Sequence, residues 1–402
     1  MDNARKPITG IAYLLSFSAF LGPFSQTIYT PVLPEVADVL HTTGFWVSMT
    51  VSFYTLCLAV MQMVYGPLTD TIGRRKVLLA GNVIYLAATL GCYFTHTIGA
   101  LLALRGLQAI GIAAGSVVAV TVIGDLFEGS KRGKAMGTFQ MMVALGPVLG
   151  PVAGGWISQW FDFHAVFLVL FAVGCAVLAL NIKYVPETKS ANRAPESFSW
   201  RDYADVLRNR IGFFVAALGF VQYYALYHYL VFLPDLLNER YALSSSQKGM
   251  AFISISLFLV IGSYAGGKLA GRMRPARLLS ATSLLIAVSI VLFMATKSHS
   301  LGLLLFSNML FGLFVGLSLP VQTVLLTATF LNKRATSVGV YNFLRYMGMT
   351  LGPVGGAVLL HAGGLDAAFG FAALLSVGCC WLGWRLDRSG ETLRKAGRGA
   401  GE

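Results

Sequence analysis

Apolar stretches of about 20 residues recur roughly every 30 residues along this chain, and each is long enough for a helix to cross a lipid bilayer. Inside lipid every backbone N–H and C=O must be satisfied within the protein, which leaves only helices and closed barrels. The stretches therefore predict an all-α membrane protein with twelve transmembrane helices. We place them at residues 8–32, 45–66, 77–95, 98–126, 135–160, 164–184, 211–235, 249–271, 277–296, 300–330, 336–361 and 366–386.

The composition also favours a membrane protein. Of the 402 residues, 56% are hydrophobic and 12% are charged, with a mean hydropathy of +0.70, whereas a soluble domain carries about a quarter charged residues. The cations behind the net charge of +13 cluster in loops between apolar stretches, which favours the membrane surface over nucleic acid as a partner. We find no G-x-x-x-x-G-K-S/T sequence and no metal-ligand spacing, so we expect no cofactor, no metal and no enzymatic activity.

We expect neither disulfides between the cysteines nor a cleaved signal peptide at the N-terminus. The five cysteines all lie inside apolar stretches and are expected to be small core residues without disulfides. They are Cys57, Cys92, Cys175, Cys379 and Cys380. The N-terminal cations followed by an apolar run resemble a signal peptide, but the run is too long and lacks a cleavage site. We expect it to remain as the first membrane helix.

The distribution of Lys and Arg predicts the orientation of the chain. Twenty-five of the 30 basic residues lie in the terminal segments and in loops after even-numbered stretches, and three lie in loops after odd-numbered ones. Because Lys and Arg accumulate on the cytoplasmic side, both termini are expected in the cytoplasm, in a multi-pass protein of the cytoplasmic membrane. The remaining two, Arg105 and Arg345, lie within predicted spans.

An internal repeat predicts two pseudo-symmetric halves. The Gly and Pro pattern of residues 146–154 recurs 202 residues later at 348–356, and Lys131-Arg132 recurs at the same offset. We therefore expect six-helix halves at 1–185 and 211–402, joined by a cytoplasmic linker at 186–210. Transporters bind cargo at the interface of such repeats, near the middle of the membrane.

The loop between the second and third predicted spans has the pattern G-x-x-x-D-x-x-G-R-basic-basic. Its residues are Gly66, Asp70, Gly73, Arg74, Arg75 and Lys76. The pattern resembles the corresponding loop of major facilitator superfamily transporters, and an ordinary basic loop of another membrane protein is the alternative. We expect the whole stretch to be a tight turn outside the lipid.

The resemblance implies a conformational latch on the cytoplasmic side. Asp125, at the end of the fourth span, would pair with Arg74, while Asp70 would face the N-terminus of the eleventh helix near residues 334–339. A carboxylate is stabilised at a helix N-terminus by the helix dipole. These contacts would hold the two halves together.

The fourth span contains Arg105 in the pattern L-x-x-x-R-x-x-Q-x-x-G, together with Gln108. It is similar to the fourth-helix motif of the superfamily, whose arginine is linked to proton coupling or substrate handling. An intramembrane Arg needs a cavity or a partner, and hydrogen bonds to carbonyls of the first helix are the structural alternative. For Arg345, in the eleventh span, the functional and structural interpretations are equally open.

The fifth span resembles the G-x-x-x-G-P-x-x-G-G motif of drug and metabolite exporters, typical of antiporters. The matching residues are Gly146, Gly150, Pro151, Gly154 and Gly155. Such residues also let helices approach closely and kink, and the two interpretations are compatible.

The first span ends in a sequence that resembles the first-helix motif of twelve-helix drug:proton antiporters, in which an acid often precedes I-Y-x-P. Here Thr27 occupies that position, and no Asp or Glu lies near the middle of any predicted span. Proton coupling would then have to use His228, Glu35 or Asp38, or the cargo itself.

Aromatic residues recur every four positions in the seventh span, so Phe220, Tyr224 and His228 share one helix face. Seventh helices line the cavity in the fold that the resemblance implies, so these rings are expected to stack on a flat or apolar cargo. An interfacial aromatic belt is the alternative for the outer rings. His228 is either a pH sensor or a hydrogen-bonded packing residue.

The resemblance to twelve-helix drug:proton antiporters implies a monomeric, proton-linked exporter of small amphipathic molecules (drug or metabolite efflux) that works by alternating access. The alternatives are a specific exporter or facilitator of an anionic or zwitterionic metabolite, and a lipid flippase or sensor on the same fold. Two buried arginines without an intramembrane acid favour a cargo that is neutral or negatively charged.

Overall fold

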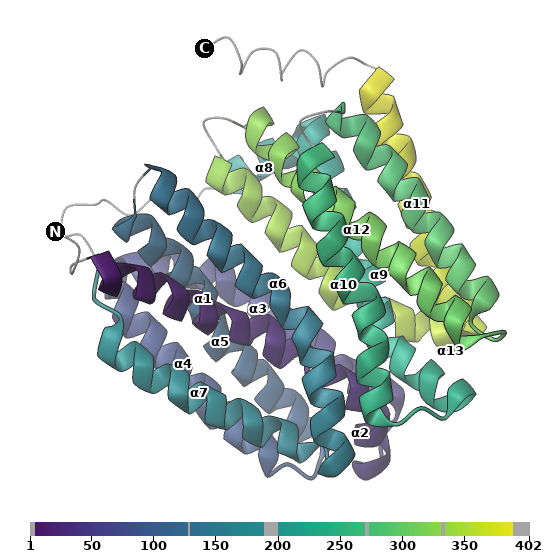
Figure 1. The fold of residues 1–402 in the computed structure, drawn as a ribbon, viewed down its shortest axis with the longest axis horizontal. Helices are drawn as coiled ribbons and strands as arrows, with labels where there is room; N and C mark the ends of the chain where they lie inside the picture. Colours follow the sequence, from purple (N-terminus) through teal and green to yellow (C-terminus); the bar gives the residue numbers. More distant parts are fainter. Residues whose placement is uncertain (1–4, 128, 189–199, 270–272, 331–333, 389–402) are drawn as a thin grey trace. The chain divides into compact units, whose positions relative to one another are not determined.

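The computed structural model describes residues 5–127, 129–188, 200–269, 273–330 and 334–388, which form helices and no strand (Figure 1). The chain divides into two compact units. The first comprises Met1–Phe198 and Leu243–Met250, and the second comprises Ser199–Ala242 and Ala251–Glu402. Each unit is described by itself.

Among the described residues of its first segment, up to residue 188, the first unit contains seven α-helices and one 3-10 helix. They are α1 (Arg5–Thr27), η1 (Thr30–Val32), α2 (Leu33–Val39), α3 (Gly44–Ile72), α4 (Arg74–Tyr93), α5 (Ile98–Leu126), α6 (Gly129–Trp160) and α7 (His164–Tyr184). The second unit contains most of the remaining helices, and the first turns of α10 belong to the first unit. These are α8 (Trp200–Arg208), α9 (Arg210–Tyr241), α10 (Ser245–Leu269), α11 (Pro275–Thr296), α12 (Leu301–Thr329) and α13 (Arg334–Arg388).

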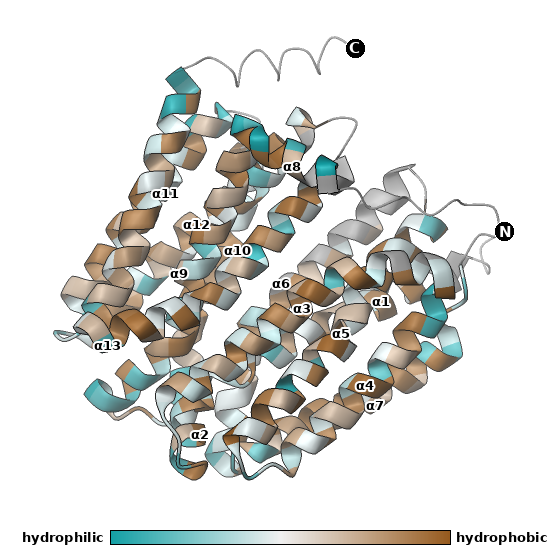
Figure 2. Cartoon of the chain, turned by 180° about the vertical axis from the view of Figure 1, so that it is seen from behind, coloured by the Kyte–Doolittle hydropathy of each residue, from teal (hydrophilic) through white to brown (hydrophobic). Residues whose placement is uncertain are grey.

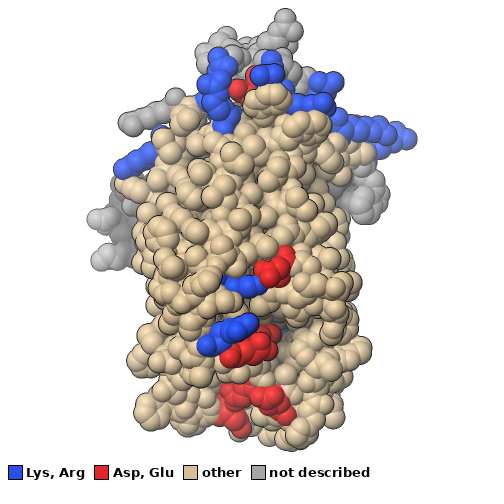
Figure 3. Space-filling view, turned by 90° about the vertical axis from the view of Figure 1, so that its right-hand side faces the viewer, with Lys and Arg blue, Asp and Glu red and all other residues tan. Residues whose placement is uncertain are grey.

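The prediction of twelve membrane helices is confirmed. Eleven helices in the described part of the chain are long and apolar enough to cross a membrane, and the last, in α13, runs from Ser337 to Arg388. Non-helical backbone at Gly363 and Gly364 divides it into two spans, with a φ of 70° at Gly364 that glycine adopts without a Cβ penalty. Hydrophobic residues cover most of the helix lengths in Figure 2. On the face shown in Figure 3, Lys and Arg gather at one end, and an area without charge separates them from a smaller group of basic and acidic residues farther along the face.

Several predicted boundaries are wrong by about six residues, among them the end of α3, the start of α6 and the end of α9. The expected turn at Gly66–Lys76 is almost entirely helical, because α3 continues to Ile72 and α4 begins at Arg74, so the turn is Gly73 alone. A 29-residue helix is about 43 Å long, enough to project beyond the hydrocarbon. The first helix ends at Thr27 rather than near residue 32. A proline is the second residue of both η1 and α2, in the first turn, where its missing N–H is not needed.

The predicted linker, 186–210, is described only in part, and residues 189–199 lie outside the described residues. Its C-terminal part contains α8, in which Val206 is fully buried next to Gly212 of α9. The domain boundaries at 185 and 211 stay a prediction.

The repeated glycines pack in the same way in both units. In the first, a Cβ added at Gly146, Gly150 or Gly154 of α6 would overlap α1 at residues 23–28. In the second, a Cβ added at residues 348, 352 or 356 of α13 would contact α9 at residues 220–232. The helix axes can approach closely only because these positions lack side chains.

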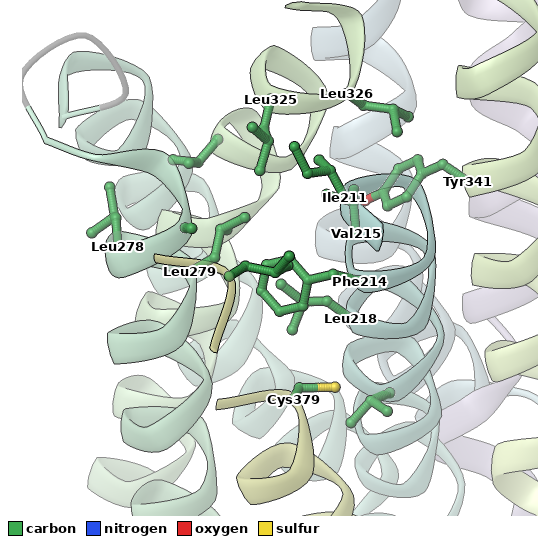
Figure 4. Packing of buried hydrophobic residues seen from close by; sticks show 14 residues of the cluster. Ile211, Phe214, Val215, Leu218, Leu278, Leu279, Leu325, Leu326, Tyr341 and Cys379 are labelled. Carbon is green, nitrogen blue, oxygen red and sulfur yellow. The ribbon is translucent and has the colours of Figure 1, made fainter. Parts of the chain in front are cut away.

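The core of the second unit is formed by apolar side chains from four helices (Figure 4). Phe214 and Leu218 of α9 lie among Leu279 of α11, Leu325 of α12 and Cys379 of α13. Because lipid is as apolar as these side chains, close van der Waals packing rather than removal from water holds α9 against the other helices of its unit.

Candidate functional site

The turn at Gly73 brings a buried ion pair together in the first unit. Gly73 has a φ of 111°, which is strained for any residue with a Cβ. Arg74 follows it and is 4% exposed, with Nε 3.3 Å from Oδ2 of Asp125 at the end of α5. Its Nη1 also donates to the Thr69 carbonyl at 3.2 Å. The pairing that the resemblance implied for Arg74 and Asp125 is thus present in the structure.

Glu187, which our sequence reasoning missed, caps α4. Its Oε1 accepts from the backbone N–H of Arg74 at 2.9 Å, and its Oε2 accepts from that of Arg75 at 3.2 Å. The first N–H groups of a helix lack intrahelical partners, and the helix dipole favours a negative charge there. The available signal was an acid directly after the sixth span, on the same predicted side as the basic loop.

Thr188 extends this network to α5. Its hydroxyl donates to Oδ2 of Asp125 at 2.9 Å, and Arg75 Nη2 donates to the Ile182 carbonyl of α7 at 2.6 Å. The end of α7 is therefore tied to the junction of α3 and α4. The side chains of Asp70 and of residues 331–336 lie outside what the structure describes, so the predicted contact of Asp70 with the eleventh span stays a prediction. Gly66 lies in the last turns of α3, partly buried.

Arg105 is fully buried in the interior of the first unit, on α5. Its Nη1 donates to the Ser25 carbonyl of α1 at 3.1 Å and to Gln108 Oε1 at 2.6 Å. The rings of Tyr54 and Tyr29 have centroids 4.2 and 5.1 Å from its guanidinium carbon. The structural alternative, a bond to a first-helix carbonyl, is observed, and Nε and Nη2 lack a hydrogen-bond partner among the described residues.

Gln108 and Thr27 occupy different surroundings. Gln108 Nε2 donates to Thr89 Oγ1 at 2.8 Å, which extends the Arg105 network to α4. Thr27 faces α6 instead, since its hydroxyl lies 2.8 Å from the Pro23 carbonyl and 3.2 Å from the Gly146 carbonyl. The residue at the position of the antiporter acid thus forms part of helix packing.

The α6 motif lies against two helices. Gly146, Gly150 and Gly154 face α1, as described above, whereas Gly155 faces the start of α10 within the first unit. A Cβ at Gly155 would lie 3.1 Å from Gly249 Cα, and the Pro151 carbonyl lies next to Gly249 as well. The five motif positions therefore allow three helices to meet with almost no side-chain volume between them.

The aromatic face predicted on the seventh span is packed within the second unit. Tyr224 is 4% exposed and His228 is fully buried, and their ring centroids are 4.5 Å apart. Phe369 of α13 lies 5.7 Å from the His228 ring, and a Cβ at Gly356 would lie 2.7 Å from His228 Nε2. His228 Nδ1 lies 2.9 Å from the Tyr224 carbonyl. In this structure α13 covers both rings, so their stacking on cargo stays a prediction.

Arg345 lies in α13 and contacts three tyrosine rings. Its guanidinium carbon is 4.8 Å from the ring centroid of Tyr223 and 5.7 Å from those of Tyr341 and Tyr346. Unlike Arg105, it is partly exposed. The two intramembrane arginines therefore differ in access while sharing tyrosine neighbours.

A buried amide cluster in the second unit was also missed by our sequence reasoning. Gln222 Nε2 donates to Ser318 Oγ at 2.7 Å, and Gln322 Nε2 donates to Gln222 Oε1 at 2.8 Å. All three side chains are buried. Isolated polar residues four apart in an otherwise apolar span, such as Ser318 and Gln322, were the available signal. Among the residues that the structure describes, no group of three or more His, Cys, Asp or Glu could hold a metal ion.

The family model of the Major Facilitator Superfamily matches residues 15–234 and 215–402, which together cover most of the chain. The chain belongs to this superfamily, and it is a transporter rather than an enzyme.

Curated relatives at low identity include a bacillibactin exporter and a multidrug resistance protein. The chain is 27% identical to the bacillibactin exporter of Bacillus subtilis (strain 168) over 339 residues, 82% of this chain and 84% of that protein. It is 29% identical to multidrug resistance protein D of Escherichia coli (strain K12) over 205 residues. That match covers 51% of this chain and spans about half, 52%, of the relative.

Solved structures show the same fold. A bacterial homologue of the human lysosomal transporter Spinster, in an inward-facing and occupied conformation, superposes with a TM-score of 0.81 at 17% identity. The superposition covers 94% of this chain and 96% of that one.

Proposed function

We propose that this chain is a monomeric secondary active exporter of small amphipathic organic molecules, with both termini in the cytoplasm. The observation that carries the proposal is the packing of the α6 glycine motif on α1. Gly150 and Gly154 bring the α6 backbone against Thr27 and Ile28, in the pattern that resembles antiporters. The name of one curated relative, the bacillibactin exporter, supports the same direction of transport.

The transport cycle follows from the duplicated halves. Alternating access in this class of transporter is rocking of one six-helix half against the other around a central cargo site. In the proposed cycle the contact of Asp70 with the eleventh span stabilises one of the two states. The network of Arg74, Asp125 and Glu187, which lies within the first unit, fixes the junction of α3 and α4 next to Asp70. A contact between a carboxylate and a helix N-terminus in a solvated loop is worth about 0.3–1 kcal/mol, enough to shift a balanced two-state equilibrium several-fold.

Proton linkage needs a route other than the first helix. Thr27 cannot titrate, and its hydroxyl is used in packing against α6. The remaining candidates are Glu35, Asp38 and His228, or a cargo that carries its own proton. Glu35 accepts a hydrogen bond from the Phe163 backbone at 3.1 Å, which gives it a structural role beside any role in proton transfer.

The test is energised transport in proteoliposomes that contain the full chain. Ethidium, a neutral aromatic amide and an aromatic carboxylate are followed with and without an imposed pH gradient. We expect gradient-dependent movement of the neutral or acidic compounds against their concentration gradient. Movement of no soluble compound, with scrambling of a labelled phospholipid instead, would replace the proposal with a flippase.

A specific exporter of an anionic or zwitterionic metabolite is the second candidate. It is favoured by Arg105 and Arg345, neither of which has a described carboxylate as an ion-pair partner. In a cavity of low dielectric, an attraction of about 1 kcal/mol between unit charges 4 Å apart in water rises to roughly 4 kcal/mol. Transport restricted to a single acidic compound in the assay above would favour this candidate over a broad exporter.

A further inference from the structure

Arg345 lies deep in a membrane-spanning segment. The candidate membrane span begins at Ser337, and eight residues at a rise of 1.5 Å place Arg345 about 12 Å along it, more than a third of the way through a hydrocarbon core of about 30 Å. Asp387 and Asp366 form ion pairs with cations elsewhere in the second unit, and no described carboxylate pairs with Arg345. Its Nε is buried without a hydrogen-bond partner among the described residues.

The tyrosine neighbours stabilise this cation only in part. The Tyr223 ring, 4.8 Å away, and the rings of Tyr341 and Tyr346, each 5.7 Å away, are within the range of cation–π attraction. Such contacts contribute about 0.5–2 kcal/mol each but leave the positive charge without a counter-charge. An ionised residue inside a membrane normally has a partner or faces a water-filled cavity. No described carboxylate pairs with Arg345, so a bound ligand can supply the missing negative charge.

The geometry indicates what that partner is. A planar guanidinium matches the two oxygens of a carboxylate, and it also stacks on aromatic faces. Arg345, Tyr223 and Tyr346 are each partly exposed, so a ligand can reach both the cation and the rings. A ligand that joins a carboxylate to an aromatic ring would satisfy both kinds of contact.

We propose that Arg345 and Tyr223 form a binding site for an aromatic carboxylate, with Arg345 holding the carboxylate and the tyrosines contacting the ring. The inference rests on the proposed function, because it names the cargo class of that exporter. It assigns cargo recognition to the second unit, at a position on α13 just before its repeated glycines.

Binding to the full-length purified protein tests the site, with 1-naphthoate as the probe. Matched probes are 1-naphthamide, which keeps the ring and shape without the charge, and 1-naphthylmethylammonium, which reverses the charge. Because a ligand that binds the native state raises apparent stability, thermal unfolding is followed at increasing probe concentration. We expect 1-naphthoate to stabilise the protein at concentrations at least about tenfold lower than either matched probe, a difference of roughly 1.4 kcal/mol.

Variants locate the interaction. Arg345→Gln should remove the preference for 1-naphthoate, Tyr223→Leu should weaken binding of the probe, and Tyr223→Phe should retain it. Arg385→Gln is the matched control, because Arg385 also lies over a ring, Trp381 at 3.9 Å, but is exposed. It should bind 1-naphthoate as the wild-type protein does. Chloride at equal ionic strength is added to show whether any small anion replaces the carboxylate.

Equal stabilisation by 1-naphthoate and 1-naphthamide in the wild-type protein would overturn the inference, even if no variant folds. Loss of the preference in Arg385→Gln, with retention in Arg345→Gln, would also overturn it, as would full competition by chloride. If energised export is intact and this preference is absent, only the inference fails. If the preference is present and no soluble compound is exported, only the proposed function fails.

Discussion

Arg74 and Asp125 form an ion pair, with 3.3 Å between Nε and Oδ2, in which the side chains are 4% and 15% exposed. The two residues are far apart in the sequence and are brought together by the turn at Gly73, which starts α4 next to the end of α5. Because both groups are largely withdrawn from water, their contribution lies between that of a surface pair and that of a fully buried one.

Asp125→Asn should lower the free energy of unfolding by about 1–3 kcal/mol, since it leaves Arg74 largely buried without its counter-charge. Transport should fall as well. Asp70→Asn should abolish or strongly reduce transport with expression near normal, because its proposed role is in the balance of conformations. Thermal unfolding and vesicle transport of both variants are measured together. Wild-type transport by Asp70→Asn would refute the latch.

Glu187→Gln should lower stability by about 0.5–1 kcal/mol, because it removes the negative charge from the N-terminus of α4 and keeps a neutral acceptor there. The effect should shrink at high salt, which screens exposed charges. Glu239→Gln, at an exposed position in the last turns of α9, is the control. Equal unfolding temperatures for the two variants would contradict the capping role.

Gly154→Ala should be strongly destabilising, by about 1–3 kcal/mol, because its new methyl group would overlap the backbone carbonyl of Ile28. Backbone cannot rotate away as a side chain can. Gly378→Ala in α13 is the matched control, because no atom lies within 4 Å of a Cβ at that position. It should be neutral or stabilising by up to about 1 kcal/mol. Thermal unfolding in one detergent compares the pair.

Arg105→Ala should abolish transport, because the guanidinium joins α5 to the Ser25 carbonyl of α1 and supplies positive charge to the interior. Gln108→Leu keeps that charge and removes one hydrogen-bond acceptor, so it should retain part of the activity. The two variants are compared by export of neutral, acidic and cationic compounds. Strong export of ethidium-like cations by Arg105→Ala would show that the proposed charge preference is wrong.

The orientation of the chain is tested by labelling of single cysteines in a background without the five native ones. Cysteines introduced within residues 129–134 or 186–210 should resist membrane-impermeant thiol reagents in intact cells, because the Lys and Arg distribution predicts that both segments are cytoplasmic. Ser244→Cys should react. Permeabilised cells serve as the control for intrinsic reactivity, and the reverse pattern would overturn the orientation.

The sequence predicted the helices well where apolar length alone decides them. The spans at 98–126 and 164–184 coincide with α5 and α7, since lipid permits little besides a helix at that hydropathy. It failed at helix ends, where α3 extends to Ile72. Polar residues beyond the hydrocarbon can either continue a helix or end it. The length of the apolar stretch does not indicate which of the two occurs.

The predicted site residues show a similar division. The pairing of Arg74 with Asp125 came from the family pattern, which carries information on tertiary contacts that a single sequence otherwise lacks. Glu187 and the cluster of Gln222, Ser318 and Gln322 were missed, because each contact joins helices whose rotation about their own axes the sequence leaves open. Tyr224 and His228 share a face because they lie four residues apart, as predicted. Which helix covers that face depends on the rotation of α9 about its axis, and in the structure it is α13.

The glycines of α6 and α13 imply a particular pattern of mutational tolerance. If every position were replaced by all other amino acids and the population selected for a functional protein, replacement should be rejected at Gly150 and Gly154, and again 202 residues later at Gly352 and Gly356. Within each pair of helices, the partner surface on α1 or α9 should accept only replacements that leave its backbone in place. A single library would thus show the internal duplication as two groups of positions that reject substitution, with the same spacing in each half.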